Sequence, residues 1–109
     1  MKKLDWNGLL ERIGPVEFGL SPDTGHGASL NIRIEENDYS FPIKDPEQAK
    51  KASQIQISQE LKDEIISRAR ERLVSMEDFL NFVDGSTAKK VVLASAALAT
   101  FDTIQEAIS

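Results

Sequence analysis

Apolar side chains in residues 16–43 alternate with small or polar ones, as in β-strands that bury one face. Three segments share this period of two. Their apolar positions are Val16, Phe18 and Leu20, then Ala28, Leu30, Ile32 and Ile34, then Tyr39, Phe41 and Ile43. The turn Glu36-Asn37-Asp38 is predicted to join the second and third segments as a hairpin, and Pro42 confines the third to a sheet edge. Residues 16–43 therefore predict a three-stranded antiparallel meander.

Helical spacing of apolar residues appears on both sides of this meander. A short helix is predicted near residues 5–13, ended by Gly14-Pro15. Its apolar positions are Trp6, Leu9, Leu10 and Ile13. Asp45 and Pro46 predict the start of a second helix over 46–54, because the carboxylate accepts from free backbone amides and proline lacks one.

Ser58 is predicted to cap a longer helix. The apolar stripe of that helix advances by three or four residues through Leu61, Ile65, Ala69, Leu73, Met76, Leu80 and Val83. Ser75-Met76-Glu77-Asp78 resembles a helix start, which leaves open whether residues 75–84 continue the same helix. Residues 55–57 are ambiguous between a connector and a short fourth strand. Asp84-Gly85-Ser86-Thr87 is predicted to end this helical segment.

A last helix is predicted from about Ala88 to Ile108, and it is uncharged between Lys90 and Asp102. Its apolar and small residues go almost all the way round, so one sheet face cannot bury them alone. The expected cover is the helix over 59–83 on one side and a second subunit on the other. The predicted interface residues are Val91, Ala94, Ala97, Leu98 and Phe101. The apolar run from Val91 to Phe101 is shorter than the ~20 residues of a membrane span, so no membrane partner is expected.

These elements predict one α+β domain over residues 1–109. It would consist of an N-terminal helix (1–14), a β-meander (15–44) and a helical half (45–109) with two or three helices, the last of them largely apolar and at an oligomer interface.

Composition narrows the function classes. The chain of 109 residues has no cysteine and one histidine, His26, which argues against thiolate or His-rich metal sites and against cysteine nucleophiles. With 13 Lys and Arg against 18 Asp and Glu, the net charge of -5 disfavours nucleic-acid binding. We expect no cofactor, no metal and no enzymatic activity, and the charged, amphipathic N-terminus is typical of a cytoplasmic protein.

The segment 21–27 is dense in functional residue types. Its candidate ligand or partner residues are Asp23, Thr24, Gly25, His26 and Gly27. Asp23-Thr24-Gly25 is the tripeptide of aspartic proteases, but the helical second half conflicts with that almost wholly β fold. The plain alternative is a connection between strands in which proline, aspartate and glycine set the turns.

A possible anion site combines two further segments. Ser86, Thr87, Lys89 and Lys90 place hydroxyls, free amides and positive charge at a predicted helix start, while Arg68 and Arg72 share a helix face and can bind carboxylates or phosphates bidentately. The alternatives are an ordinary helix cap with surface lysines, and a solvated face balanced by Glu64 and Glu71.

Residues 4–43 loosely resemble the amino-terminal half of class I type III secretion chaperones. The shared features are a short helix with Leu9-Leu10 that ends at Ile13-Gly14, followed by three strands with glycine in the first connection. The resemblance implies a small acidic dimer. Residues 45–109 depart from it, because those chaperones add two further strands before a final helix, and no functional residue is carried over.

The function that this pattern favours is a small, acidic, non-enzymatic binding protein. It would be an inhibitor, immunity protein, antitoxin or chaperone-like adaptor that docks on a basic protein partner and also self-associates. The alternative is an oligomer that binds or sequesters a small anionic ligand such as a nucleotide.

Overall fold

The protein is seen here in a computed structural model that describes residues 5–13, 17–21, 28–43, 45–56 and 58–108. The structure confirms the α+β class. The described elements are, in chain order, α1 (Trp6–Glu11), β1 (Glu17–Ser21), β2 (Ala28–Ile34), β3 (Asn37–Ile43), α2 (Pro46–Ser53), α3 (Gln59–Ser75), α4 (Glu77–Phe82) and α5 (Gly85–Ile108).

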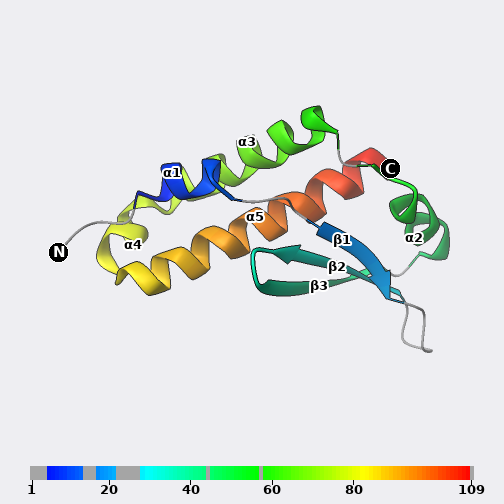
Figure 1. The fold of residues 1–109 in the computed structure, drawn as a ribbon, viewed down its shortest axis with the longest axis horizontal. Coiled ribbons are helices and arrows are strands. Elements are labelled where there is room, and N and C mark those ends of the chain that lie inside the picture. Colours follow the sequence, from blue (N-terminus) through cyan, green and yellow to red (C-terminus); the bar gives the residue numbers. More distant parts are fainter. Residues whose placement is uncertain (1–4, 14–16, 22–27, 44, 57, 109) are drawn as a thin grey trace.

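Helix α5 is the centre of the molecule. Helix α3 lies along one side of α5 and the sheet lies on the opposite side, as Figure 1 shows. Helix α1 packs against both α5 and α3, and α2 packs against α5 and all three strands. Twenty-four residues at 1.5 Å each make α5 about 36 Å long. This one helix therefore sets most of the 47 Å long axis of the protein.

The sheet is antiparallel with the strand order β1-β2-β3. On the central strand β2, Leu30, Ile32 and Ile34 are fully buried, while Arg33 between them is exposed. This is the alternation that the sequence predicts for a sheet covered on one face. Pro42 lies in the edge strand β3, where it faces Ser29 across the ladder. An edge is the place where a residue without an amide hydrogen is tolerated.

The hairpin between β2 and β3 turns earlier than predicted. Ile34 faces Asn37 in the ladder, so Glu35 and Glu36 form a two-residue loop, and Asn37 and Asp38 belong to β3. Glu35 has φ 56°, in the left-handed region. Two-residue hairpin loops need positive φ at one or both central residues, and the predicted turn was wrong because glutamate carries no signal for that conformation.

Replacing the strained glutamate by glycine is expected to stabilise the protein. Glu35→Gly should raise the free energy of unfolding by about 1 kcal/mol, because glycine adopts positive φ without a Cβ clash. The neighbouring Glu36→Gly is the matched control, and it should be neutral or destabilising since glycine adds freedom to the unfolded chain. Urea denaturation measures both. Equal effects of the two substitutions on the free energy of unfolding would show that the positive φ of Glu35 causes no strain.

The predicted helix caps at Asp45 and Ser58 are confirmed. The Asp45 carboxylate accepts from the Glu47 amide at 2.9 Å, and the Ser58 hydroxyl accepts from the Leu61 amide at 3.1 Å. The question left open for residues 75–84 is answered by a break at Met76, where φ is -111° and ψ is 15°. Residues 55–56 are not part of a strand, and Ile57 lies outside the described residues.

The last helix begins at Gly85, three residues before the predicted start, because the preceding aspartate caps it. The predicted cover of this helix by the helix over 59–83 is confirmed, because α3 packs along α5. Eleven of its residues are buried inside a single chain by the other helices and the sheet. The buried hydroxyls of Thr100 and Thr103 donate to the carbonyls of Ala96 and Ala99, at 2.8 and 2.7 Å, so neither is left without a partner.

By length and composition alone, α5 is the one described helix that could cross a membrane. More than half of its apolar window is buried within the protein, as in the core helix of a globular domain.

Candidate functional site

Two of the sequence-predicted sites fare differently in the structure. The candidate loop residues Asp23, Thr24, Gly25, His26 and Gly27 lie outside the described residues. The candidate anion site at the start of the last helix is described, and it is filled from within the chain. Asp84 Oδ1 accepts from the Thr87 amide at 2.8 Å, and Asp84 Oδ2 accepts from the Thr87 hydroxyl at 3.1 Å.

This carboxylate corrects the expectation of free amides at Ser86 and Thr87. A helix N-terminus attracts an anion, and Asp84 supplies one covalently tethered at the right distance. The same hydrogen bonds to Thr87 lower the pKa of the Asp84 carboxyl from its usual 3.8. Lys89 is directed elsewhere, with its Nζ 3.8 Å from Glu35 Oε2 in the hairpin turn.

The structure also separates Arg68 and Arg72 from the two lysines. Arg68 binds Glu64 at 3.0 Å and Glu106, and Arg72 Nη2 donates to Asp102 Oδ2 at 2.6 Å. The Arg68–Glu106 and Arg72–Asp102 pairs connect α3 to the C-terminal half of α5. Since Asp102 follows Lys90 by twelve residues, the two groups of cations are about 18 Å apart along the helix. They do not converge on one ligand.

The capping role of Asp84 predicts a pH-dependent stability. A carboxyl whose pKa is lowered on folding stabilises the protein above the pKa of the unfolded chain, and this contribution is lost as the pH falls from about 4 through the lowered value. Asp84→Asn keeps a capping acceptor but has no charge. At pH 7 the wild type should melt a few degrees above Asp84→Asn.

Thermal melts of both proteins from pH 7 to pH 2.5 test this. The difference in melting temperature should stay constant down to pH 5 and shrink below pH 4. A difference that is independent of pH would show that the charge of Asp84 contributes nothing to the cap.

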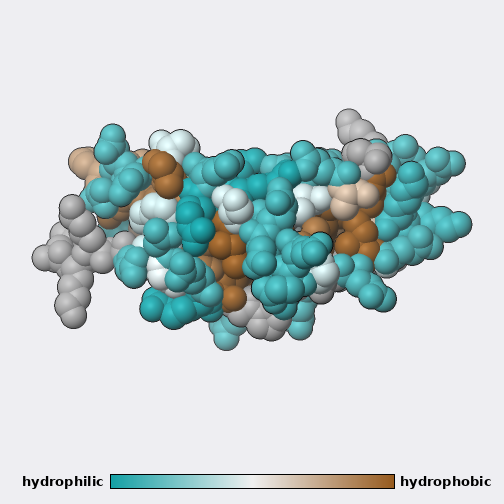
Figure 2. All heavy atoms as spheres, turned by 90° about the horizontal axis from the view of Figure 1, so that it is seen from above, coloured by the Kyte–Doolittle hydropathy of each residue, from teal (hydrophilic) through white to brown (hydrophobic). Residues whose placement is uncertain are grey.

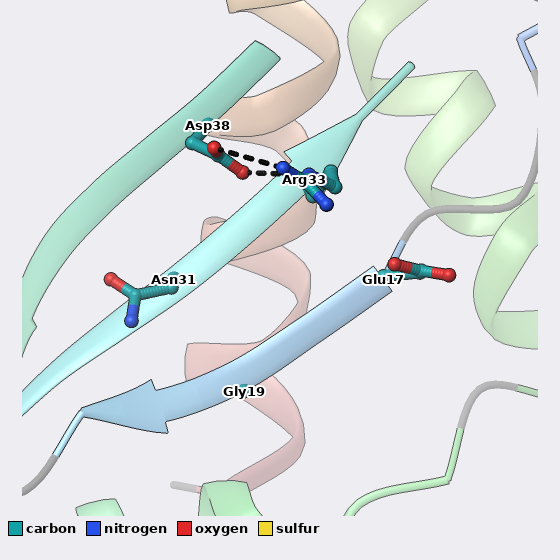
Figure 3. Close-up of a pocket in the computed structure, with 5 residues that line it drawn as sticks. All are labelled: Glu17, Gly19, Asn31, Arg33 and Asp38. Atoms are coloured by element: carbon teal, nitrogen blue, oxygen red, sulfur yellow. Dashed lines mark hydrogen bonds and ion pairs between the residues drawn. The ribbon is translucent and has the colours of Figure 1, made fainter. Parts of the chain in front are cut away.

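The outer face of the sheet carries a shallow polar depression that the sequence analysis did not single out. It is lined by Glu17 and Gly19 on β1, Asn31 and Arg33 on β2, and Asp38 on β3 (Figure 3). Arg33 and Asp38 form an ion pair at 3.0 Å, and the Ser40 hydroxyl donates to Asn31 Oδ1 at 2.8 Å. Because the cation and one carboxylate neutralise each other, this depression offers no unpaired acid and base.

Groups that could hold a metal ion are also absent from the described ranges. No three His, Cys, Asp or Glu side chains come together there.

The most unusual exposed surface in the described residues is apolar and lies at the corner between α3 and α4. We call Val74, Phe79 and Phe82 the α4 corner. Phe82 is 88% exposed, Val74 is 55% exposed and Phe79 is 49% exposed. Apolar side chains are visible at the end of the molecule that α4 occupies (Figure 2). The two phenylalanines are three residues apart and therefore share a face of α4.

Sequence reasoning missed the α4 corner because it followed a single stripe through Met76, Leu80 and Val83. That stripe does face inward, with Leu80 buried and the other two partly buried. The phenylalanines fall outside it and have no core to enter after the break at Met76. The sequence did contain a signal for this surface, namely two phenylalanines that lie outside the apolar stripe of their helix.

The predicted interface residues on α5 divide into two groups. Leu98 is 39% exposed, and Val91, Ala94 and Phe101 are partly buried. Ala97 is fully buried inside the chain, so its place in the predicted interface was wrong. The Phe101 ring stacks on Phe41 of β3, with centroids 4.6 Å apart and the planes 13° from parallel.

Comparison with known proteins gives no relative. No protein family matches the chain, and neither a curated protein nor a solved structure is significantly similar to it.

Proposed function

We propose that this protein is a non-enzymatic binding protein that acts through protein–protein contact, with the α4 corner as the docking surface. The observation that carries the proposal is the exposure of Phe82, of which 88% is accessible in the single chain. A phenylalanine that is exposed on a helix adds little to the free energy of unfolding, because folding removes little of its apolar surface from water. Aromatic side chains dominate the binding energy of interfaces when a partner buries them.

The charge around the α4 corner defines the kind of partner. Glu77 and Asp78 are exposed on the same short helix as the phenylalanines. The nearby cations Arg70 and Arg72 on α3 are engaged with Glu11 and Asp102. An apolar centre with an acidic margin is complementary to an amphipathic partner segment whose margin is basic. With a net charge of -5, the whole chain favours approach of such a partner.

The direct test uses a defined probe. A 14-residue helical peptide of leucine and lysine, with leucines on one face, should bind the wild type with a micromolar Kd by calorimetry. Binding should weaken from 50 to 500 mM salt, because exposed charge pairs are screened. Phe82→Ser should weaken binding at least tenfold. A tenfold loss corresponds to about 1.4 kcal/mol of binding free energy, and removing a buried aromatic contact usually costs more than that.

Two controls make the test specific. The same peptide with glutamate in place of lysine should not bind, and Phe82→Ser should leave the melting temperature unchanged, because the side chain is exposed. Binding that is equal for the two peptides, or equal for wild type and Phe82→Ser, would overturn the proposal.

The proposal extends to the biological class. An acidic docking surface of this kind suits a cytoplasmic inhibitor, immunity protein, antitoxin or chaperone-like adaptor. Self-association is also proposed, through a different surface. The anionic-ligand function is not proposed, because the four cations of the candidate anion site are separated and three of them are paired with carboxylates.

A further inference from the structure

Helix α5 keeps one uncovered strip along its length. Between positions 88 and 104 the partly buried or exposed residues, apart from Lys89, all fall on one side of the helix at 100° per residue. We call this side the α5 strip. It consists of four apolar residues, Val91, Ala94, Leu98 and Phe101, with Lys90 at one end and Asp102 at the other. The strip lies between the side of α5 that binds α3 and the side that stacks on β3.

The order of residues in the α5 strip is self-complementary. Lys90 lies six residues before Ala96 and Asp102 lies six residues after it. The apolar members are arranged about the same point, with Val91 and Phe101 at a separation of five residues, and Ala94 and Leu98 at a separation of two. Reversing the helix direction about position 96 therefore places each cation on an anion and each small side chain on a large one.

We propose that the α5 strip binds a second copy of this chain, with the two α5 helices antiparallel and a two-fold axis at the level of Ala96. In this arrangement Ala94 of each copy receives Leu98 of the other, and Val91 meets Phe101. Lys90 of each copy approaches Asp102 of the other. A two-fold interface uses the same patch on both subunits, which is what the internal symmetry of the α5 strip provides.

Two features favour a second copy over an unrelated partner. The middle of the strip is uncharged, so two chains of net charge -5 can approach there without placing like charges in contact. The strip has opposite charges at its two ends, so Lys90 and Asp102 of two copies come to the same level only when the helices are antiparallel. Asp102 is held in place by Arg72, and Phe101 is held by its stack on Phe41. Binding therefore costs little side-chain entropy at these two positions.

The inference goes beyond the proposed docking function and uses none of the α4 corner residues. Sedimentation equilibrium over 1–300 µM should show a monomer–dimer equilibrium for the wild type. Leu98→Asp should shift dissociation at least tenfold to higher concentration, because it introduces two unpaired charges into the apolar middle. Lys90→Glu, an exposed substitution that leaves the core untouched, should weaken the dimer about three- to tenfold by facing Asp102.

Phe82→Ser is the control for independence, since it should leave the dimer unchanged while it weakens peptide binding at least tenfold. A wild type that stays monomeric at 300 µM, or a dimer insensitive to both Leu98→Asp and Lys90→Glu, overturns the inference. The docking function would stand in either case, because the calorimetric test depends on other residues.

Cross-linking tests the direction of the helices. The chain contains no cysteine, so single substitutions report without background. A mixture of Ala94→Cys and Leu98→Cys proteins should form disulfide-linked heterodimers under mild oxidation, since the proposed pairing brings these positions within the Cα separation that a disulfide spans. Each variant alone should cross-link several-fold more slowly. Faster linkage of Ala94→Cys with itself would indicate parallel helices and overturn the proposed arrangement.

Discussion

Replacing Ile32 by alanine is expected to remove about 3–4 kcal/mol from the free energy of unfolding, a large part of the stability of a domain of this size. Ile32 is fully buried at the middle of β2, where it faces the core and pairs with Phe18 on one side and Tyr39 on the other. Removing three carbons there leaves a cavity that the rigid ladder on both sides cannot close. Urea denaturation measures the loss.

The adjacent Arg33 provides the matched control. Its side chain is 56% exposed on the open face of the sheet, and its pair with Asp38 is of the solvated kind that contributes less than about 1 kcal/mol. Arg33→Ala should therefore cost much less than Ile32→Ala. Similar losses for the two substitutions would mean that the sheet does not face the core as described.

The parts of the fold that follow from local sequence were predictable. Alternation along β2 identified the residues that face the core, and the capping side chains of Asp45 and Ser58 marked helix starts to within a residue. These features need only neighbours in the sequence. The hairpin turn was displaced because ladder register, with Ile34 opposite Asn37, overrode the intrinsic preference of Glu35.

Long-range pairing explains what the sequence left out of the candidate sites. Arg72 and Asp102 are thirty residues apart in the chain, and Arg68 and Glu106 are thirty-eight apart. No spacing rule connects them, so arginines that looked available for a ligand are engaged within the fold. At Ser86 and Thr87 the engaged partner is local. Asp84 lies three residues before Thr87, which is the spacing of a helix cap.

The burial of α5 has the same origin. An all-round apolar helix needs cover on every side. The sequence predicted cover from the helix over 59–83, but it did not reveal that α1 and α2 would also pack against α5. What remains uncovered is narrow, and it is the α5 strip. The prediction of self-association thus keeps four of its five residues, and it now depends on their arrangement instead of on the total apolar content of the helix.

The contact between α3 and α5 should be the least tolerant of added volume. Ala99 is fully buried, and it lies on the same side of α5 as Asp102 and Glu106, three and seven residues further on, which bind Arg72 and Arg68 of α3. Ala69 on α3 is likewise fully buried. Small residues on both helices allow close approach, so Ala99→Leu is expected to lower the free energy of unfolding by about 3 kcal/mol through overpacking.

Ala94→Leu is the matched control on the same helix. Ala94 lies on the uncovered α5 strip, so the same added volume should change the free energy of unfolding by less than about 0.5 kcal/mol when measured at a concentration where the chain is monomeric. Denaturation of the two variants compares the buried and uncovered sides of one helix directly. If Ala99→Leu were tolerated as well as Ala94→Leu, α3 could not pack closely on α5, and the two ion pairs between them would have to form across a wider gap.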